Sequence, residues 1–366
     1  MNITSLGFEG FRNLCDGEIT PCRGVNVIYG KNAQGKTNLV ECIWLLSGNR
    51  SFRGARDSEL VGFGRDAAKI KAEFFSEGRI QTSEISLIRG KKGAFLNGVK
   101  QRSSAALLGH LCAVVFSPEH LTLVKGGPDG RRSFIDGAIC QIKPGFKDTL
   151  SSYKRTLIQR NSLLKDIPRH PGLEETLDAW DQRLAVLGAN VIRVRMKYTE
   201  RLCECASRYH MGISHNSERL NIDYAGTVPK EYCGDIGSVR DQLLKMLLDK
   251  RNDDIAAGST SAGPHRDDLE ITINGESVRR YGSQGQQRSC VLSMKIAEEE
   301  LIRLSVSEEP LVLLDDVLSE LDSRRQDFLL NEIGDRQVFI TCCESASVER
   351  LKGGKLFEIN GGKVNF

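Results

Sequence analysis

The chain has 366 residues, of which 40% are hydrophobic and 27% are charged, and this composition is typical of a folded protein with one large or two medium domains. No apolar run approaches the roughly eighteen residues that a membrane span needs, and the N-terminus lacks the basic start and long apolar stretch of a secretory signal. We therefore expect a cytoplasmic protein that works away from membranes.

The charges and the cysteines narrow the class of protein further. The net charge is only +3, so the chain as a whole is not a polycation. The segment 117–215 carries 16 basic and 11 acidic residues, and this local surplus suits a polyanionic partner, although a solvated helix face by itself explains it better. The 11 cysteines lack the paired spacing of a zinc site, which favours buried free thiols.

The start of the chain predicts an α/β fold. Two strands and a loop are expected in residues 1–37, and apolar residues on one face place a helix over 36–46. Alternating residues from about 68 to 99 predict antiparallel strands with an Asn-Gly hairpin turn. A buried strand is expected at 111–116.

The middle of the chain has a mainly helical sequence pattern. Helical periodicity with mixed charges runs from about residue 131 to 215, and strands are predicted again at 219–224 and 268–278, on either side of a helix over 236–250. The α/β pattern then resumes with a helix at 284–305, a strand at 311–314, a helix at 321–332 and a strand at 338–341. One core domain split by a compact helical insertion is therefore expected.

Residues 30–37, GKNAQGKT, fit the phosphate-binding pattern G-x-x-x-x-G-K-[ST]. The glycines let consecutive backbone N–H groups point at phosphate oxygens, and the helix that follows adds its N-terminal amides. A buried strand before the loop and a helix after it are the context that this motif requires, and they argue against a chance match. The predicted nucleotide ligands are Gly30, Lys31, Asn32, Ala33, Gln34, Gly35, Lys36 and Thr37, with the Thr37 hydroxyl also a ligand for Mg²⁺.

An acid pair follows the apolar strand 311–314. Asp315 and Asp316 stand at its C-terminal end, where ligands bind in open α/β sheets. Asp315 is expected to hold Mg²⁺ through water, and Asp316 to orient or deprotonate the attacking water. The alternative is that Asp315 only caps the next helix. Together with Lys36 these acids form the predicted catalytic set.

A Ser-x-Gly-Gln turn opens the long helix about thirty residues before the acid pair. Ser283, Gly285 and Gln286 offer a hydroxyl, bare backbone and a helix N-terminus to an anion. An ordinary helix cap at Ser283 is the alternative, and the position of the turn ahead of the acid pair favours the anion site. We therefore count these residues among the nucleotide ligands.

The order of these motifs, followed by Ser319-Glu320-Leu321-Asp322, resembles the ABC-type ATPases. The resemblance implies an ABC-type P-loop ATPase head with an inserted, mainly helical lobe. It also implies that the S-x-G-Q turn of one subunit covers the γ-phosphate on the P-loop of a second, so that ATP closes a homodimer. The expected domains are an N-terminal ATPase part (1–130), a helical insertion lobe (131–215) and a C-terminal ATPase part (216–366).

Within that class the chain resembles the RecF family of bacterial recombination-repair proteins. The matching segments are FEGFRNL (8–14), YGKNAQGKTNLVECIWLLS (29–47), VVFSPEHLTLVKGGPDGRRSFID (114–136), SAGPHRDDL (261–269), YGSQGQQRS (281–289) and VLLDDVLSELD (312–322). The resemblance implies slow, DNA-stimulated ATP hydrolysis and binding to duplex and gapped or single-stranded DNA. It further implies work with RecO and RecR to load RecA during DNA repair, recombination, replication and the SOS response.

The chain departs from the wider ABC pattern at three places. Asp316 stands where a glutamate is usual, Thr341 stands where a histidine switch is expected, and no Q-loop glutamine is evident, with Glu119 only a positional candidate. Whether His265 has a structural, a nucleotide-adjacent or a strand-capping role stays open. The same holds for Arg131 and Arg132, as phosphate contacts or partners of nearby acids.

Basic residues of the helical lobe are the predicted contacts to DNA phosphates. They are Lys154, Arg155, Arg160, Arg193, Arg195 and Lys197. The alternative for the whole chain is an ABC-type ATPase subunit without a DNA role. A measurement of DNA binding distinguishes an ATPase that acts on DNA from one that does not.

Overall fold

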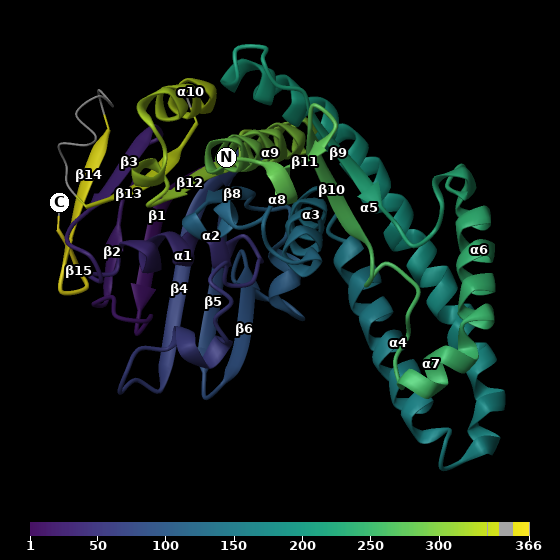
Figure 1. The fold of residues 1–366 in the computed structure, drawn as a ribbon. Coiled ribbons are helices and arrows are strands. Elements are labelled where there is room, and N and C mark those ends of the chain that lie inside the picture. Colours follow the sequence, from purple (N-terminus) through teal and green to yellow (C-terminus); the bar gives the residue numbers. More distant parts are fainter. Residues whose placement is uncertain (335, 344–353, 366) are drawn as a thin grey trace. The chain divides into compact units, whose positions relative to one another are not determined.

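The computed structural model describes residues 1–334, 336–343 and 354–365, which form two units (Figure 1). The first unit contains Met1–Leu123, Arg208–Glu218 and Ser283–Phe366, and the second contains Val124–Ser207 and Arg219–Gly282. The second unit is larger than the predicted lobe, because 219–282 adds a small sheet and three helices to the helical residues before it. The sequence prediction had placed that segment in the ATPase part.

The central sheet of the first unit has the order β15-β14-β3-β13-β12-β8. Its strands are β3 (Val25–Tyr29), β8 (Ala113–Phe116), β12 (Leu311–Asp315), β13 (Val338–Cys342), β14 (Lys355–Asn360) and β15 (Lys363–Asn365). All neighbours are parallel except the β14–β15 pair. The inner strands β12 and β13 and the edge strand β8 are buried along their whole length, which explains why their sequences are runs of apolar residues without alternation.

A second, antiparallel sheet of the first unit has the order β2-β1-β4-β5-β6-β7. Its strands are β1 (Asn2–Glu9), β2 (Gly17–Ile19), β4 (Ala67–Ser76), β5 (Arg79–Ile88), β6 (Lys91–Leu96) and β7 (Val99–Lys100). Strand β4 alternates strictly between exposed and buried residues, as expected when one face packs on the core.

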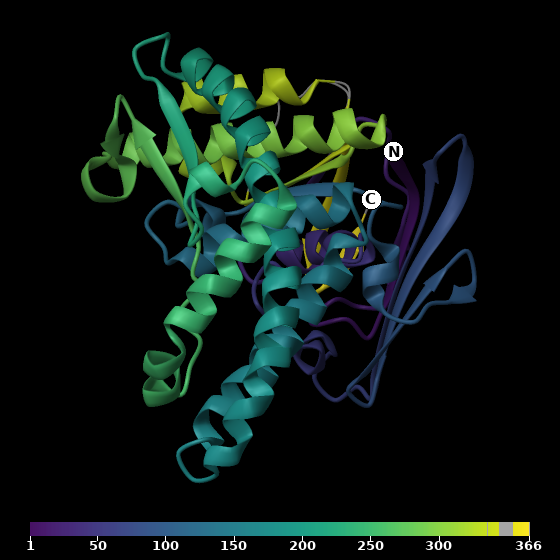
Figure 2. The same ribbon diagram turned by 90° about the vertical axis from the view of Figure 1, so that its right-hand side faces the viewer.

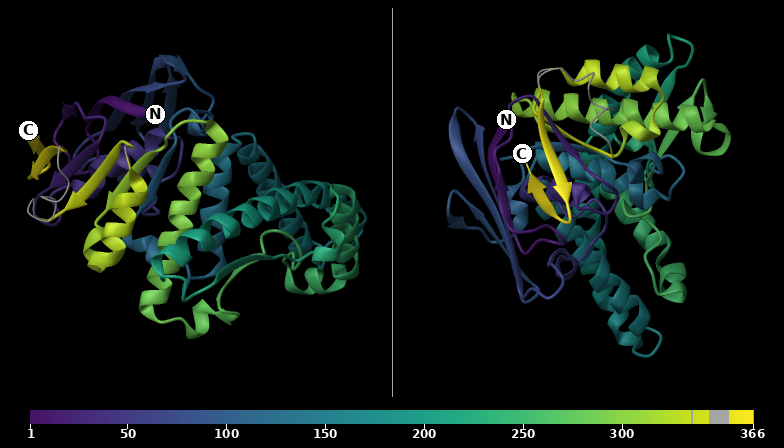
Figure 3. Two further views of the ribbon diagram at one scale, coloured as in Figure 1. Left: turned by 90° about the horizontal axis from the view of Figure 1, so that it is seen from above. Right: turned by 90° about the vertical axis from the view of Figure 1, so that its left-hand side faces the viewer.

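Helix α1 (Lys36–Leu46) lies in the core that the two sheets share. Its Ile43 and Leu46 belong to one apolar cluster with Phe74 of the antiparallel sheet and Leu313 of the central sheet. Helices α9 (Gln284–Val306) and α10 (Ser323–Ile333) lie side by side (Figure 3). The short α2 (Pro118–Leu121) follows β8 and packs on α9. Burial of α1 on nearly all sides fixes the position of the loop that precedes it.

The second unit is mainly helical (Figure 2). Its helices are α3 (Pro128–Ile142), α4 (Phe146–Asp166), most of α5 (Leu177–Ile213), α6 (Ile236–Asp249), α7 (Arg251–Ala257) and α8 (Val278–Tyr281). A three-stranded antiparallel sheet, β11-β10-β9, is formed by β9 (Leu220–Ala225), β10 (Asp268–Ile273) and β11 (Glu276–Ser277). Even the 37-residue α5 lacks the apolar length to cross a membrane, as do the other helices in the described part of the chain.

Candidate nucleotide site

The phosphate-binding loop joins β3 to α1 and depends on two glycines. Gly30 has a φ of 147° and Gly35 a φ of 117°, conformations that L side chains rarely adopt. A Cβ on Gly30 would lie 2.3 Å from the carbonyl oxygen of Ile359, so the neighbouring strand also excludes a side chain there. Helix α1 has no side-chain cap and no acidic residue in its first turn. Its N-terminal amides are therefore available to an anion.

Lys36 is held over this loop by the loop's own backbone. Its Nζ donates to the carbonyl oxygens of Gly30 at 2.7 Å and Lys31 at 3.0 Å, and the residue is only 8% exposed. An ammonium group solvated by carbonyls keeps its charge while leaving a donor free for a phosphate oxygen. The loop therefore presents a positive charge in the concavity that its amides form.

Other parts of the first unit brace the loop from behind. Asn13, which follows β1, donates from Nδ2 to the carbonyl oxygen of Ala33 at 3.2 Å, and its Oδ1 accepts from Asn38 of α1 at 2.6 Å. Gln34 accepts from the backbone N–H of Gly361 at 2.5 Å, and Cys343 lies with Sγ 3.0 Å from Oδ1 of Asn32. The Gln34–Gly361 and Cys343–Asn32 contacts join residues more than 300 positions apart, so no local sequence motif indicates them.

Asp315 lies beside Thr37, which joins the acid pair to the loop. The Thr37 hydroxyl donates to Oδ1 of Asp315 at 2.9 Å, and Thr341 of β13 donates to the same oxygen at 2.9 Å. Asp315 is the last residue of β12 rather than a helix cap, because Asp322 caps the next helix, α10. The helix-cap alternative for Asp315 is therefore excluded.

The electrostatics of Asp315 suit a cation. Burial raises its pKa, the carboxylates of Glu119 and Asp316 raise it further, and the hydrogen bonds from Thr37 and Thr341 oppose this. The negative charges of Asp315, Glu119 and Asp316 repel one another, and a hard divalent cation would reduce this repulsion. The hydroxyl of Thr37 and the carboxylate of Asp315 are oxygen donors of the kind Mg²⁺ requires, so the residues fit the ion.

Asp316 has an unusual backbone for a residue with a side chain. Its φ is 51°, in the left-handed region, and its N–H donates to Oγ1 of Thr341 at 2.8 Å. Its carbonyl oxygen accepts from Ser319 at 2.8 Å. Thr341 thus contacts both acids, through its donor to Asp315 and its acceptor for Asp316. The residue in place of the expected histidine orients the pair, a role that sequence reasoning missed because it requires β12 and β13 to be neighbours.

The S-x-G-Q turn is a helix cap that is fixed on two sides. Ser283 and Gln286 form a reciprocal capping box, with 3.2 Å from the Gln286 N–H to the Ser283 hydroxyl and 2.9 Å from the Ser283 N–H to the Gln286 side chain. Arg325 of α10 donates to the carbonyl oxygen of Gly285 at 3.1 Å, and Glu218 accepts from the Gln286 side chain at 2.9 Å. Ser283 is therefore the N-cap of α9, and the turn still has an exposed outer face that is accessible to an anion.

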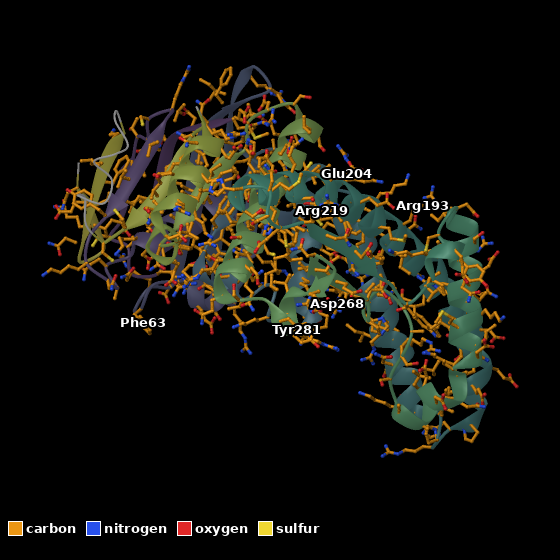
Figure 4. All side chains as sticks on the ribbon, turned by 45° about the horizontal axis from the view of Figure 1, so that its top comes forward. Phe63, Arg193, Glu204, Arg219, Asp268 and Tyr281 are labelled. Atoms are coloured by element: carbon orange, nitrogen blue, oxygen red, sulfur yellow. The ribbon has the colours of Figure 1, made fainter. Side chains whose placement is uncertain are left out.

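The predicted DNA contacts divide into two groups. Lys154, Arg155 and Lys197 are exposed on α4 and α5. Arg193 is half-buried on α5 (Figure 4), and it donates to the carbonyl oxygen of Gly234 at 3.1 Å. These four keep their place as candidates.

Arg160 and Arg195 do not belong to that set. Arg160 is fully buried and donates to Asp181 at 2.6 Å and to Asp254 at 2.7 Å. Arg195 is 4% exposed and holds both carboxylate oxygens of Asp136 at 2.8 and 2.9 Å. Because both guanidinium groups are enclosed and neutralised within the second unit, neither can reach a DNA phosphate, and these two predictions are corrected.

Three residues of the second unit whose roles the sequence left undecided make structural contacts. His265 lies with Nδ1 2.7 Å from the Tyr153 hydroxyl and Nε2 3.0 Å from the carbonyl oxygen of Thr260, which ties its loop to α4. Arg131 is buried and pairs with both oxygens of Asp268 at 2.6 and 2.7 Å. Arg132 donates to the carbonyl oxygen of Asp267 and pairs with Asp129.

Comparison with known sequences identifies a family that matches almost the whole chain. The model of the RecF/RecN/SMC N terminal domain matches residues 2–360. The DNA replication and repair protein RecF of Acetivibrio thermocellus is 38% identical over 356 residues, which are 97% of this chain and 96% of that protein. The protein of the same name from Oceanobacillus iheyensis is 40% identical over 375 residues, and the match covers 100% of both chains.

Comparison with solved structures points to the same family as comparison with sequences. The structure of the recombination mediator protein RecF-ATPrS in the RecFOR pathway has a TM-score of 0.94 at 38% identity, with 100% of this chain and 97% of that chain covered. The RecF-ATP structure of the same pathway has a TM-score of 0.93, also at 38% identity, over 99% and 96% of the two chains. A Smc head domain derived from Pyrococcus furiosus, at 16% identity and a TM-score of 0.57, shares the fold alone. The predicted α/β head fold is confirmed.

Proposed function

This chain belongs to the RecF family of ABC-type ATPases, and from that premise we propose that it is an ATP-driven dimeric clamp on DNA. The observation that carries the proposal is the 2.9 Å hydrogen bond from Thr37 to Asp315, which unites the phosphate-binding loop and the acid pair in one site. A solved structure that is 38% identical to this chain is described as RecF-ATP, which supports ATP as the nucleotide.

ATP is held by groups that the fold prepares in advance. The N-terminal amides of α1 and the loop backbone bind the β- and γ-phosphates, and Lys36 exchanges a carbonyl contact for a phosphate oxygen. Thr37 directly and Asp315 through water would hold Mg²⁺, which would supply positive charge beside the phosphates. Asp316 orients the attacking water, and its side chain, shorter than the usual glutamate, suits slow hydrolysis.

The S-x-G-Q turn acts on the nucleotide of a second copy. Ser283 and the first-turn amides of α9 present a hydroxyl and a partial positive charge, which the γ-phosphate of an ATP on the opposite subunit complements. Closure then requires two bound ATP molecules, and hydrolysis reopens the dimer. Because the turn is fixed by Arg325 and Glu218 of its own chain, it is rigid before the second copy arrives.

DNA is the proposed working surface, and the cytoplasm the proposed location. Lys154, Arg155 and Lys197 are exposed on the second unit, and Arg193 lies on the same helix as Lys197. Contacts of this kind read the phosphate backbone, so duplex DNA and the duplex beside a single-strand gap both fit. Membership in the family supports work with RecO and RecR in the loading of RecA at gaps, with DNA stimulating a weak ATPase.

The proposal is tested by fluorescence anisotropy with labelled duplex DNA, with and without ATP-Mg²⁺. The wild type should bind DNA more tightly with ATP, and the affinity should fall steeply with salt because phosphates are contacted. Lys36→Met should remove the ATP effect, while Lys71→Met, an exposed lysine on β4, should not. ATP hydrolysis without any DNA binding would favour an ABC-type ATPase subunit that has no DNA role.

A further inference from the structure

Glu218 lies in the short segment Arg208–Glu218 of the first unit, which contains the end of α5 and the loop after it. Its carboxylate has two partners in the same unit. Oε1 accepts from Nε2 of Gln286 at 2.9 Å, and Oε2 lies 2.9 Å from Nε2 of His210. Since an ionised carboxylate only accepts hydrogen bonds, Nε2 of His210 carries a proton. The carboxylate therefore connects the S-x-G-Q turn to the end of α5.

The Gln286 side chain is the part of the turn that this contact orients. Its Oε1 accepts from the backbone N–H of Ser283 at 2.9 Å, and the Ser283 hydroxyl accepts from the Gln286 N–H at 3.2 Å. With its Nε2 bound to Glu218, the amide cannot rotate without breaking both the Glu218 contact and the contact to Ser283. Glu218 thus fixes the capping box that presents the Ser283 hydroxyl.

His210 in turn fixes Glu218. It is fully buried, and its Nδ1 lies 3.4 Å from Oγ of Ser293 on α9, a hydroxyl that donates to the carbonyl oxygen of Ser289 at 2.8 Å. Burial lowers the pKa of His210, whereas the Glu218 carboxylate and a backbone hydrogen bond at Ser289 oppose this. A buried ring with a fixed donor leaves the Glu218 carboxylate one stable orientation.

We propose that Glu218 is a positioning residue for the ATP-facing S-x-G-Q turn, held in place by His210 at the end of α5. The effect on ATP rests on the proposed function, in which the turn acts on the nucleotide of a second copy. Both ends of the segment Arg208–Glu218 continue into the second unit, through α5 on one side and β9 on the other. The hydrogen bond from Gln286 therefore ties the turn to a segment that is covalently continuous with the unit that carries the candidate DNA contacts.

Three variants of the full chain test this inference. Glu218→Ala removes the acceptor for both partners. Glu218→Gln keeps the shape, and its carbonyl oxygen can still accept from Gln286 while its NH₂ donates to His210, whose proton then moves to Nδ1, facing Ser293. Glu204→Ala is the matched control, because Glu204 is exposed on α5 (Figure 4).

Two readouts separate the positioning role from the proposed function. Hydrogen exchange of residues 283–287 without nucleotide reports the order of the turn directly, and sedimentation with ATP-Mg²⁺ reports dimerisation. Glu218→Ala should exchange about tenfold faster in that segment and dimerise about tenfold more weakly, the scale of a lost helix cap. Its ATP affinity as a monomer should stay unchanged, and Glu218→Gln and Glu204→Ala should resemble the wild type.

Each outcome decides one of the two claims. Unchanged exchange at 283–287 in Glu218→Ala overturns the positioning role, whatever the dimer does. Faster exchange together with a wild type that never dimerises upholds the positioning of the turn and overturns its proposed action on a second copy. Faster exchange with dimerisation equal to the wild type means that the order of the turn does not matter for ATP, which overturns the inference.

Discussion

The Thr37 hydroxyl donates a hydrogen bond to Oδ1 of Asp315 across 278 positions of sequence. Helix α1, buried in the core between the two sheets, places Thr37, and the parallel pairing of β12 with β13 places Asp315. Thr341, paired with Asp315 in that register, donates to the same oxygen. The site is therefore a product of the central sheet, with the loop on one side and the threonine of β13 on the other.

Thr341→Val should lower ATP hydrolysis at saturating ATP by about tenfold, with little change in ATP affinity. Valine has nearly the same shape, but it cannot donate a hydrogen bond to Asp315 or accept one from the Asp316 N–H. Steady-state ATPase assays and binding of labelled ATP measure the two effects. Thr341→Ser keeps the hydroxyl and should recover most of the rate, and a fully active Thr341→Val protein would refute the orienting role.

Ser283→Arg should leave ATP binding by the monomer intact and block ATP-dependent dimerisation. The residue lies on the exposed face of the turn, so a long side chain there obstructs a second copy without disturbing the phosphate-binding loop. Labelled ATP and analytical ultracentrifugation measure the two properties. If the variant dimerises like the wild type, the turn does not act on a second subunit.

Arg160→Ala should destabilise the protein by about 3 kcal/mol, because it removes the cation that pairs with the buried carboxylate of Asp254 and one of the two that pair with Asp181. Lys154→Ala, on the exposed face of the same helix, should change the free energy of unfolding by less than about 0.5 kcal/mol. Urea unfolding compares the two. A small loss in Arg160→Ala would contradict a structural role for its buried ion pairs.

Glu299 gives the stability of the protein a dependence on pH. Burial raises its pKa to about 7, and the charge of Glu309 adds to this although Arg336 opposes it. The folded state therefore binds a proton more tightly than the unfolded chain, so stability falls as pH rises from the ordinary glutamate pKa toward 7 and this contribution is constant above it.

Glu299→Gln should remove that dependence. The variant should be more stable than the wild type at about pH 8, and the difference should vanish at about pH 5, where the wild-type side chain is largely protonated. Arg336 keeps Glu309 as a partner at 2.9 Å in the variant. Urea unfolding across this pH range gives the comparison, and a difference that does not change with pH would contradict the raised pKa. Glu204→Gln, on an exposed site, is the control.

The parts of the site that sequence reasoning predicted are those that lie close together in the chain. The loop 30–37, the acid pair and the S-x-G-Q turn are local patterns whose chemistry requires particular residue types at fixed spacing. Thr341, Arg325 and Glu218 were missed as positioning groups because their partners come from distant segments. The burial of Arg160 was missed for the same reason, since Asp254 is 94 positions away.

The domain boundaries follow the same logic. Helical periodicity predicts a start of the insertion near residue 131, whereas the second unit begins at Val124. Its end was not visible, because β9 and β10 have the same alternation as strands of any other sheet. Their pairing with each other, and the ion pair between Arg131 of α3 and Asp268 of β10, assign them to the second unit.

Sedimentation of the full chain with ATP-Mg²⁺, with and without duplex DNA, tests the central claim most directly. We expect a monomer without nucleotide, a dimer with ATP-Mg²⁺ and a further shift toward the dimer when DNA is present. A monomer under all three conditions would contradict it, because the S-x-G-Q turn would then have no second nucleotide to cover and ATP would have no clamp to close.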